Sequence, residues 1–543
     1  MDKVNDKLLI KVRGWIDDED FSKLVSIARY LGRNGRYSYF KLDLDVINSK
    51  SLNVDDVVDI LESTGAEYSE DLIEYLKSSI KGREVILSYD GSNIIARFNF
   101  YLGSLMGKLR DVLTYRRELR AFIAKPFKYK ELLSRLKGLD LNIRDETGFK
   151  LNNPLGYDVR FTGLLRDYQE EALRAWKLNN YRGIIALPTG SGKTVIAIAA
   201  LASLSQRTLI VAYTKEQLHQ WRNSILKFTN IPEYLIGMYY SEEKRLSPVT
   251  LTTYQTAYRY VDKFAKLYTL LIVDEVHHLP ADKFKFIAEM LPAPYRLGLS
   301  ATPYREDGKH TELFPLMGGV VYYKSPSELA KQGYLAEYKI VTLKVNLKPD
   351  ELRTLNKLRR RYRELVGYAR FEDVLEAARR GDEKAIEALR LHNSMNLIIH
   401  KSRSKVEKAK EIIERELSRG SKIIVFAHYV DLAKQIAKET NAYLLTGDVP
   451  ADKRKYILNE FKKAKSGVLV VTTLGDEGLD IPDANIGVLV AGTGSRRQFI
   501  QRLGRLLRPA NGKVAVLYEI VTKGTVEELQ SKRRKDVKLD DIM

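Results

Sequence analysis

The sequence predicts an α/β protein of several domains, in which two blocks of alternating strands and helices follow an α+β N-terminal region and flank a helical insert. Two observations predict this class. Apolar runs such as TLIVAY and LLIVDEV alternate with helical segments between residues 155 and 322, and the same alternation resumes from 399 to 543. Near-continuous apolar strands separated by helices are typical of a parallel sheet covered on both faces. A chain of 543 residues exceeds what one core supports, so we expect roughly three to five domains.

The other segments of the chain have different patterns of apolar and charged residues from these two blocks. Residues 1–78 alternate charged amphipathic helices, such as DVVDILES, with short strands. Their role is unknown, and binding a partner, binding DNA or extending the domain that follows are the open alternatives. Residues 79–150 begin with two strand-like runs around the turn Asp90-Gly91-Ser92, and a basic segment with a helical pattern follows. A long charged block, here called the helical insert (residues 346–398), interrupts the strand–helix rhythm. The expected divisions are therefore 1–78, 79–150, 155–322, 346–398 and 399–543.

Composition restricts the possible partners and compartments. With 90 Lys and Arg against 70 Asp and Glu, the formal charge is +20. Such a positive charge attracts polyanions, above all nucleic acid. The alternative is that the charge only keeps the protein in solution. The absence of cysteine excludes disulfides, cysteine-ligated zinc, iron–sulfur clusters and thiol catalysis. No long apolar run indicates a membrane span, and the start MDKVNDKLLIKVRGW lacks the apolar core of a signal peptide, so we expect a cytoplasmic protein.

The segment ALPTGSGKT (186–194) follows a short apolar run and indicates a phosphate-binding loop. Glycines let the backbone approach phosphate closely, and N–H groups at the start of the next helix bind anions. The lysine reaches the β- and γ-phosphates of a nucleotide, and the threonine hydroxyl binds Mg²⁺. Leu187 stands where the general pattern has a glycine, and a plain turn is the alternative. The predicted contacts with ATP come from Thr189, Gly190, Ser191, Gly192, Lys193 and Thr194.

A second acidic segment, LLIVDEVHH, supplies what a phosphate loop requires. Asp274 follows four apolar residues and is suited to hold Mg²⁺, and Glu275 can polarise the water that attacks the γ-phosphate. His277 and His278 raise the question of zinc. Two adjacent residues in one turn rarely bind one ion, so a zinc site is disfavoured.

Six segments in chain order resemble the motifs of superfamily 2 helicases, and they cover roughly residues 160–510. They are LLRDYQEEAL, LPTGSGKT, DEVHH, LSATP, TTLGDEGLDIP and QFIQRLGRLLRP. The resemblance implies two RecA-like P-loop domains that close around ATP. It also implies that His277 belongs to the catalytic motif and that Arg166 and Gln169 contact adenine. In the second domain it implies roles for Gly478 and Asp480 in linking the nucleotide to the DNA-binding surface, and for Gln501, Arg505 and Arg508 in catalysis.

Arg505 and Arg508 are expected to face the γ-phosphate. Arg502, Arg505 and Arg508 recur every third residue, so several of them can share one side of a helix. Arginines supplied by a second domain stabilise transition-state charge only when the two domains meet.

Within the superfamily, the chain resembles the XPB-type DNA helicases. YREDGKH directly follows SATP, the helical insert lies where that family has its thumb, and LTYRRELRAFIAKPFKYK resembles the end of its damage-recognition domain. The resemblance implies 3′–5′ movement on duplex, forked or bubble DNA in nucleotide excision repair. It implies a strand-separating wedge at Arg305, Glu306 and Asp307. The basic thumb segment, with Arg359, Arg360, Arg361 and Tyr362, suits phosphate contact and stacking, although it also reads as a solvated helix.

The compact chain resembles the archaeal members, which pair with a structure-specific nuclease, so we expect a monomer or a heterodimer. Two other interpretations stay open: an RNA helicase, and a nucleotide-controlled DNA clamp that activates a nuclease. The complete set of Lys193, Asp274, Glu275, Arg505 and Arg508 argues against an inactive ATPase.

Overall fold

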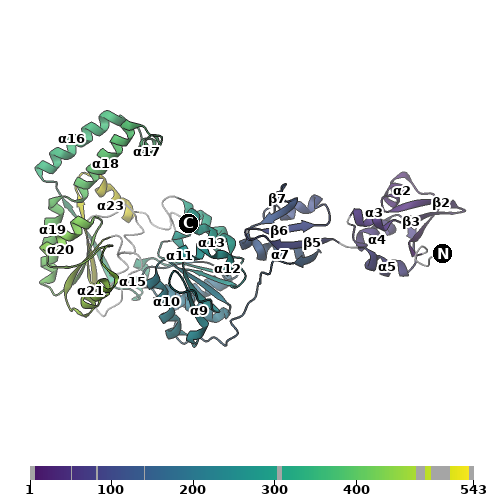
Figure 1. Cartoon of the computed structure of the whole chain (residues 1–543), viewed down its shortest axis with the longest axis horizontal. Coiled ribbons are helices and arrows are strands. Elements are labelled where there is room, and N and C mark those ends of the chain that lie inside the picture. Colours follow the sequence, from purple (N-terminus) through teal and green to yellow (C-terminus); the bar gives the residue numbers. More distant parts are fainter. Residues whose placement is uncertain are drawn as a thin grey trace. The chain divides into compact units, whose positions relative to one another are not determined.

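The computed structural model describes residues 7–50, 52–80, 83–139, 141–302, 308–472, 484–490 and 514–536. The chain divides into two compact units (Figure 1). The first contains residues 1–153 together with 257–269 and 282–294, and the second contains the rest. None of the helices in the described ranges has the length and apolar character needed to cross a bilayer.

Residues 7–80 form a small α+β domain with its own apolar core. In the described part of this range, four strands make an antiparallel sheet in the order β2-β3-β1-β4. Buried and more exposed residues alternate along β1 and β3, so that Ile10, Val12, Phe40 and Leu42 enter a core shared with the helices. The elements are β1 (Leu9–Arg13), α2 (Asp18–Val25), β2 (Ala28–Asn34), β3 (Tyr37–Leu42), α3 (Leu44–Ser49), α4 (Val54–Ser63), β4 (Ala66–Glu67) and α5 (Asp71–Ser79).

Residues 83–139 and 141–149 hold a second domain, in which five strands pair in the order β7-β8-β6-β5-β9. The expected turn joins β5 to β6, where the Asp90 carboxylate accepts bonds from the backbone N–H groups of Ser92 and Asn93. Ala265 from the segment 257–269 packs into the core of this domain. The elements are β5 (Glu84–Tyr89), β6 (Ile94–Phe98), α6 (Met106–Leu109), β7 (Thr114–Arg116), β8 (Ala121–Ala124), α7 (Tyr129–Lys137), β9 (Asn142–Asp145), α12 (Val261–Ala265) and α13 (Asp282–Met290).

The first lobe of the second unit is built on a parallel sheet. As described through 154–302 and 308–323, its strands run in the order β12-β13-β11-β14-β15-β10-β16. The helices α8, α9 and α10 share an apolar core with the strands. This arrangement confirms the α/β class. The elements are α8 (Asp167–Leu178), β10 (Arg182–Ala186), α9 (Lys193–Leu204), β11 (Thr208–Ala212), α10 (Lys215–Phe228), β12 (Ile236–Tyr239), β13 (Val249–Thr253), α11 (Tyr254–Arg259), β14 (Leu270–Val273), β15 (Tyr295–Ser300), α14 (Leu313–Met317), β16 (Val320–Tyr323) and α15 (Pro326–Lys331).

The second lobe repeats this architecture. Over residues 337–345, 403–472, 484–490 and 514–536, the strands form a parallel sheet in the order β17-β22-β21-β18-β20-β19. Apolar residues of α19 and α20 pack against β18, β20 and β21. The elements are β17 (Glu337–Val345), α19 (Arg403–Leu417), β18 (Lys422–Ala427), α20 (Val430–Glu439), β19 (Tyr443–Leu445), α21 (Ala451–Lys463), β20 (Gly467–Thr472), β21 (Ile486–Leu489), β22 (Val514–Thr522) and α23 (Val526–Asp536).

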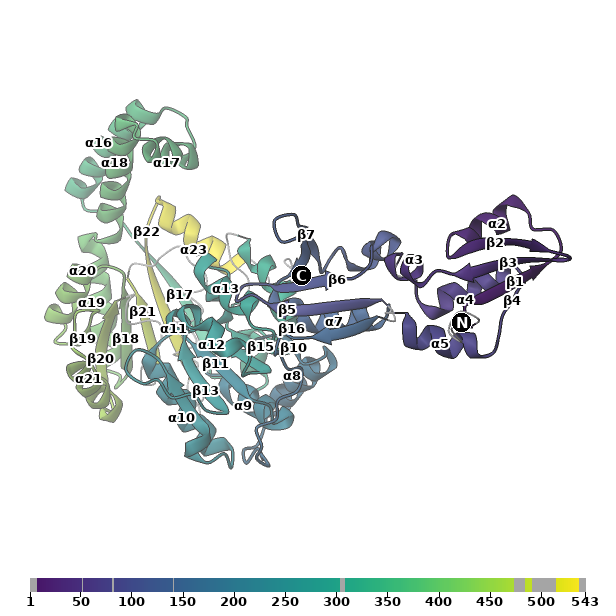
Figure 2. The same ribbon diagram turned by 45° about the vertical axis from the view of Figure 1, so that its right-hand side comes forward.

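The helical insert contains α16 (Pro349–Val366), α17 (Phe371–Arg379) and all but the last two residues of α18 (Glu383–His400). Figure 2 shows α16 and α18 side by side, and Leu355 of α16 packs with Met395 and Ile399 of α18. The insert therefore has an apolar core of its own.

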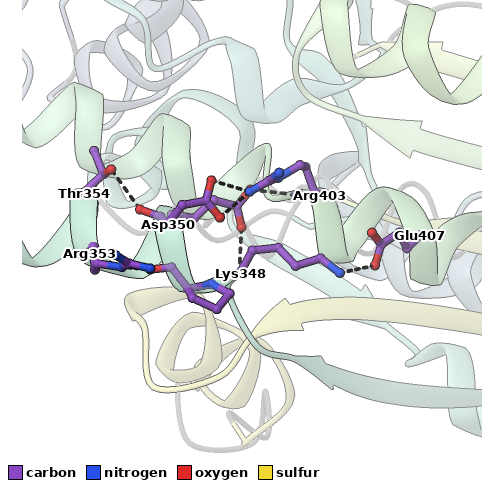
Figure 3. A network of polar contacts seen from close by, with 8 residues as sticks. Lys348, Asp350, Arg353, Thr354, Arg403 and Glu407 are labelled. Atoms are coloured by element: carbon purple, nitrogen blue, oxygen red, sulfur yellow. Dashed lines mark hydrogen bonds and ion pairs between the residues drawn. The ribbon is translucent and has the colours of Figure 1, made fainter.

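A polar network ties the two ends of the helical insert together (Figure 3). The Glu351 carboxylate accepts a bond from the backbone N–H of Lys348 at 2.9 Å and another from that of Arg403 at 2.9 Å. The Arg403 guanidinium also donates to both oxygens of Asp350, and the Lys348 ammonium donates to Glu407 at 2.7 Å. One carboxylate thus bridges the residue before α16 and the first residue of α19.

A buried ion pair supports the same region from inside. Lys405, which is 0% exposed, pairs with Glu527, and His400 lies 2.8 Å from the same carboxylate. Glu527 also accepts the backbone N–H of Thr522 at 2.9 Å. Burial alone would raise the pKa of Glu527, but His400 and Lys405 outweigh it and hold the pKa at about 2. The end of α18, the start of α19 and α23 therefore meet at one charged group.

We expect Glu527→Gln to weaken the second lobe by about 3 kcal/mol at neutral pH, because Lys405 loses its buried counter-ion. The pKa of Glu527 in the folded state lies below its ordinary 4.5. Its stabilisation is therefore fully present above pH 4.5 and is lost as the pH falls toward 2. Hydrogen exchange of the β22 amides, measured as a free energy of opening, tests both statements.

The neighbouring variant Glu528→Gln is the matched control, because Glu528 pairs with Lys344 at the surface. Its effect on β22 exchange should be much smaller. Equal effects of the two variants would show that Glu527 has no special place in the lobe.

Candidate nucleotide-binding site

Three loops meet at the carboxyl edge of the first-lobe sheet. The strands β14, β15 and β10 are neighbours and run parallel, so the segments after them emerge at the same edge. These segments are the glycine-rich loop (residues 186–194), the acidic motif (residues 274–278) and the SAT segment (residues 300–302). The backbone N–H of Leu187 donates to the carbonyl of Ser300 at 3.0 Å, which joins the first loop to the third. Ligands of parallel α/β sheets bind at this edge.

The glycine-rich loop has a backbone that glycine permits. Gly190 has φ +86° and Gly192 has φ +80°, and the latter is the N-cap of α9. Ser191 is fully buried, and its hydroxyl donates to the carbonyl of Pro188 at 2.7 Å. The loop thus leads into the first turn of a twelve-residue helix, where free N–H groups and the helix dipole favour an anion.

Lys193 is folded back onto this loop. Its ammonium donates to the carbonyls of Leu187 at 2.9 Å and Pro188 at 3.2 Å. Burial lowers the pKa of Lys193, while Glu275 and Asp274 act in the opposite direction. A cation held by two neutral carbonyls can move to a phosphate, which is the stronger acceptor.

Gln169 contacts the glycine-rich loop directly. Its amide nitrogen donates to the carbonyl of Ser191 at 2.9 Å, and its amide oxygen accepts the backbone N–H of Arg166 at 2.9 Å. The hydroxyl of Tyr168 donates to the same Ser191 carbonyl at 2.5 Å. The Arg166 guanidinium lies 5.8 Å from the centre of the Tyr334 ring. Gln169 therefore contacts the loop and Arg166 lies next to Gln169, while their contact with adenine stays a prediction. Tyr168 and Tyr334 are neighbours that sequence reasoning missed.

Gly192→Ala is expected to reduce ATP affinity about tenfold or more. A β-carbon at Gly192 would lie 2.6 Å from the Gln169 amide nitrogen, so the variant must displace Gln169 in addition to adopting a left-handed backbone. A titration with labelled ATP measures the change.

Gly319→Ala is the matched control, since Gly319 has φ +77° and nothing within 4 Å of an added β-carbon. It carries the backbone strain alone. If the two variants bound ATP equally well, the contact between Gln169 and the loop would have no part in nucleotide binding.

The acidic motif begins directly after β14. The Trp221 indole N–H donates to one Asp274 oxygen at 2.9 Å, and the backbone N–H of Glu275 donates to the other at 3.0 Å. Burial raises the pKa of Asp274, and the bond from Trp221 and the charge of Lys193 lower it. Thr194 is the second residue of α9. A carboxylate and a hydroxyl are hard oxygen ligands of the kind Mg²⁺ prefers, so Asp274 and Thr194 fit that ion.

Glu275 adopts an unusual backbone conformation. Its φ of +47° and ψ of 52° are left-handed, which costs about 1–2 kcal/mol for a residue other than glycine. The Tyr254 hydroxyl donates to the carbonyls of both Asp274 and Glu275, at 2.9 and 3.1 Å. Strain of this kind is kept where the neighbouring structure enforces it, and it is typical of functional sites.

His277 links the acidic motif to the SAT segment. It is 0% exposed, its Nδ1 lies 3.0 Å from the Ser300 hydroxyl, and the same nitrogen lies 3.3 Å from a Glu275 oxygen. Ser300 in turn accepts the backbone N–H of Thr302 at 3.1 Å. Through the described residues, no cluster of three or more histidine, cysteine or acidic side chains suits a metal.

Several predicted residues lie outside the described residues. They are Arg305, Glu306 and Asp307 behind the SAT segment, and Gly478, Asp480, Gln501, Arg505 and Arg508 in the second lobe.

The predicted DNA contacts on α16 differ in their surroundings. The Arg360 side chain is 87% exposed, and Arg361 pairs with Glu387 at 3.2 Å. Arg359 is half-buried. Tyr362 is also half-buried and packs against both apolar clusters of the helical insert. Of these four residues, Arg360 and Arg361 are therefore better placed than Tyr362 to meet a ligand from solvent.

Two families match parts of the chain. Residues 162–305 match the family described as "Type III restriction enzyme, res subunit", and residues 387–541 match the family described as "ERCC3/RAD25/XPB C-terminal helicase".

Curated relatives are similar over most of the chain. The "DNA 3'-5' translocase XPB2" of Sulfurisphaera tokodaii is 38% identical over 77% of this chain and 94% of its own length. The "Putative DNA 3'-5' helicase Rad25" of Halobacterium salinarum is 32% identical over 72% of this chain, and the "DNA 3'-5' helicase XPB" of Mycobacterium tuberculosis is 30% identical over 67%. The chain spans 59% and 61% of the lengths of these last two relatives.

Proposed function

The chain belongs to the XPB-type superfamily 2 DNA helicases, and from that membership we propose that it opens duplex DNA during nucleotide excision repair. It is an ATP-hydrolysing DNA helicase or translocase of 3′–5′ polarity. The observation that carries the proposal is that the glycine-rich loop, the acidic motif and the SAT segment meet at one edge of a parallel sheet.

Each residue at this edge of the sheet has a separate role in ATP hydrolysis. The N–H groups at the start of α9 and the Lys193 ammonium hold the phosphates. Thr194 and Asp274 would hold Mg²⁺, which would neutralise phosphate charge when bound. The Glu275 carboxylate orients the attacking water, and its left-handed backbone together with His277 fixes where that carboxylate lies. Gln501, Arg505 and Arg508 complete the site from the second lobe.

The DNA is held by charge. A formal charge of +20 favours a polyanion, and Arg359, Arg360 and Arg361 on α16 are suited to phosphate contact. The bridged ends of the helical insert keep these arginines in register with the second lobe. Arg305, Glu306 and Asp307 separate the strands.

A structure-specific nuclease is the partner we propose, and the chain acts in the cytoplasm as a monomer or as a heterodimer with that nuclease. An RNA helicase is the alternative, because the nucleotide site serves either substrate. A nucleotide-controlled DNA clamp that activates the nuclease is the other.

One experiment separates these functions. The ATPase rate is measured without nucleic acid and with single-stranded DNA, forked duplex DNA or RNA, while strand displacement is followed on the fork. We expect the fork to stimulate hydrolysis most and to be unwound. Stimulation by RNA alone would favour the RNA helicase, and stimulation by duplex without displacement would favour a translocase or clamp.

A further inference from the structure

The domain of residues 7–80 has a sheet face that its own core does not use. Along β1 and β3 the inward residues enter the apolar core, and the residues between them point to the other face. On that outer face Lys11 lies opposite Tyr39, and Arg13 lies opposite Tyr37. Both tyrosines are half-buried, and neither belongs to the core of the domain.

The outer face is strongly basic. The Lys11 ammonium lies 4.8 Å from the centre of the Tyr37 ring and pairs with Glu67 at 3.1 Å. Arg29 on β2 and Lys41 on β3 lie opposite one another. Among the described residues of these four strands, the outer face therefore carries four cations against one carboxylate: Lys11, Arg13, Arg29 and Lys41 against Glu67.

On β2, the position opposite Tyr39 carries no side chain. Gly32 lies opposite Tyr39, and a β-carbon added there would meet nothing within 4 Å. Aromatic rings on a middle strand, with cations around them, are the arrangement by which sheets bind unpaired bases and their phosphates.

We propose that this face binds single-stranded DNA, with Tyr37 and Tyr39 stacking on bases and Arg13, Arg29 and Lys41 contacting phosphates. An acidic peptide would use the cations but would leave two tyrosines without a role. A sequence-tolerant strand uses both, because every base has a face that stacks. The choice of DNA over RNA rests on the proposed function. The site gives the motor a tethered second contact with an unpaired strand.

The test uses the full chain and a fluorescein-labelled oligo-dT of about 20 nucleotides without ATP. The double variant Tyr37→Ala/Tyr39→Ala should bind about tenfold or more weakly, since each stacked base contributes about 1–3 kcal/mol. The double variant Tyr37→Phe/Tyr39→Phe keeps the rings and should bind like the wild type. With 5-iododeoxyuridine in the oligonucleotide, photo-crosslinking should label the peptide that contains Tyr37 and Tyr39.

Charge is tested by Lys41→Ala against Lys77→Ala, a substitution of the same residue type on α5 of the same domain. Only Lys41→Ala should lower the slope of log affinity against log salt, by about 1. Unchanged binding by the alanine pair, equal loss in the phenylalanine pair, or no crosslink at residues 37–39 would overturn the proposal. So would a loss confined to an oligo-U RNA of equal length. ATPase stimulation of the wild type by forked DNA decides the proposed function separately, because the binding assay contains no ATP.

Discussion

Lys193→Ala is expected to lower the ATPase rate by about 100- to 1,000-fold, with forked DNA present at saturation. The ammonium is held by two carbonyls of the glycine-rich loop, within the influence of Asp274 and Glu275. The glycine-rich loop offers no second predicted cation for the phosphates. Removal of the Lys193 ammonium therefore leaves the negative charge of the phosphates poorly balanced as the γ-phosphate departs. Steady-state phosphate release measures the rate.

Lys215→Ala is the control for this variant. Lys215 begins α10, the next helix along the chain, and it pairs with Glu242 at the surface. We expect hydrolysis at the wild-type rate. Should Lys193→Ala hydrolyse ATP equally fast, the assignment of the phosphate site would be wrong.

Glu275→Gln is expected to preserve ATP binding and to slow turnover about 100-fold or more. Two contacts that hold this residue involve its backbone, because Tyr254 donates to its carbonyl and its own N–H donates to Asp274, and a third joins its side chain to His277. Glutamine can keep these contacts and the left-handed backbone, so the variant isolates the loss of the carboxylate charge. Single-turnover hydrolysis of bound ATP measures the chemical step.

Nucleotide binding by this variant can be followed through Trp221, whose indole N–H donates to Asp274. Glu216→Gln on α10 is a control of equal charge change. If Glu275→Gln failed to bind ATP, Glu275 would be a residue that shapes the site rather than one that orients water.

Much of the nucleotide site could be predicted from the sequence, because its chemistry lies in short segments. An apolar strand followed by ALPTGSGKT, and another followed by DEVHH, place Lys193 and Asp274 at the same edge of any parallel sheet. The strand that lies between them, β15, carries the SAT segment.

Contacts from distant segments could not be predicted in this way. Trp221 lies on an amphipathic helix, where its apolar position indicates only burial, and its bond to Asp274 depends on how α10 packs. The left-handed backbone of Glu275 follows from the turn after β14, and nothing in its residue type indicates it. Tyr362 stands among arginines in the sequence, yet the 3.6-residue period turns its ring toward the core of the helical insert.

The polar network in Figure 3 has a consequence for how such a chain could have been assembled. Because a single carboxylate joins the amides at positions 348 and 403, the polypeptide departs from the second lobe and comes back at nearly one spot. An inserted segment whose two ends lie close together can be lengthened, shortened or exchanged without disturbing the strands on either side. The helical insert and the second lobe can thus change independently in evolution, while the ion pairs at their junction hold them together.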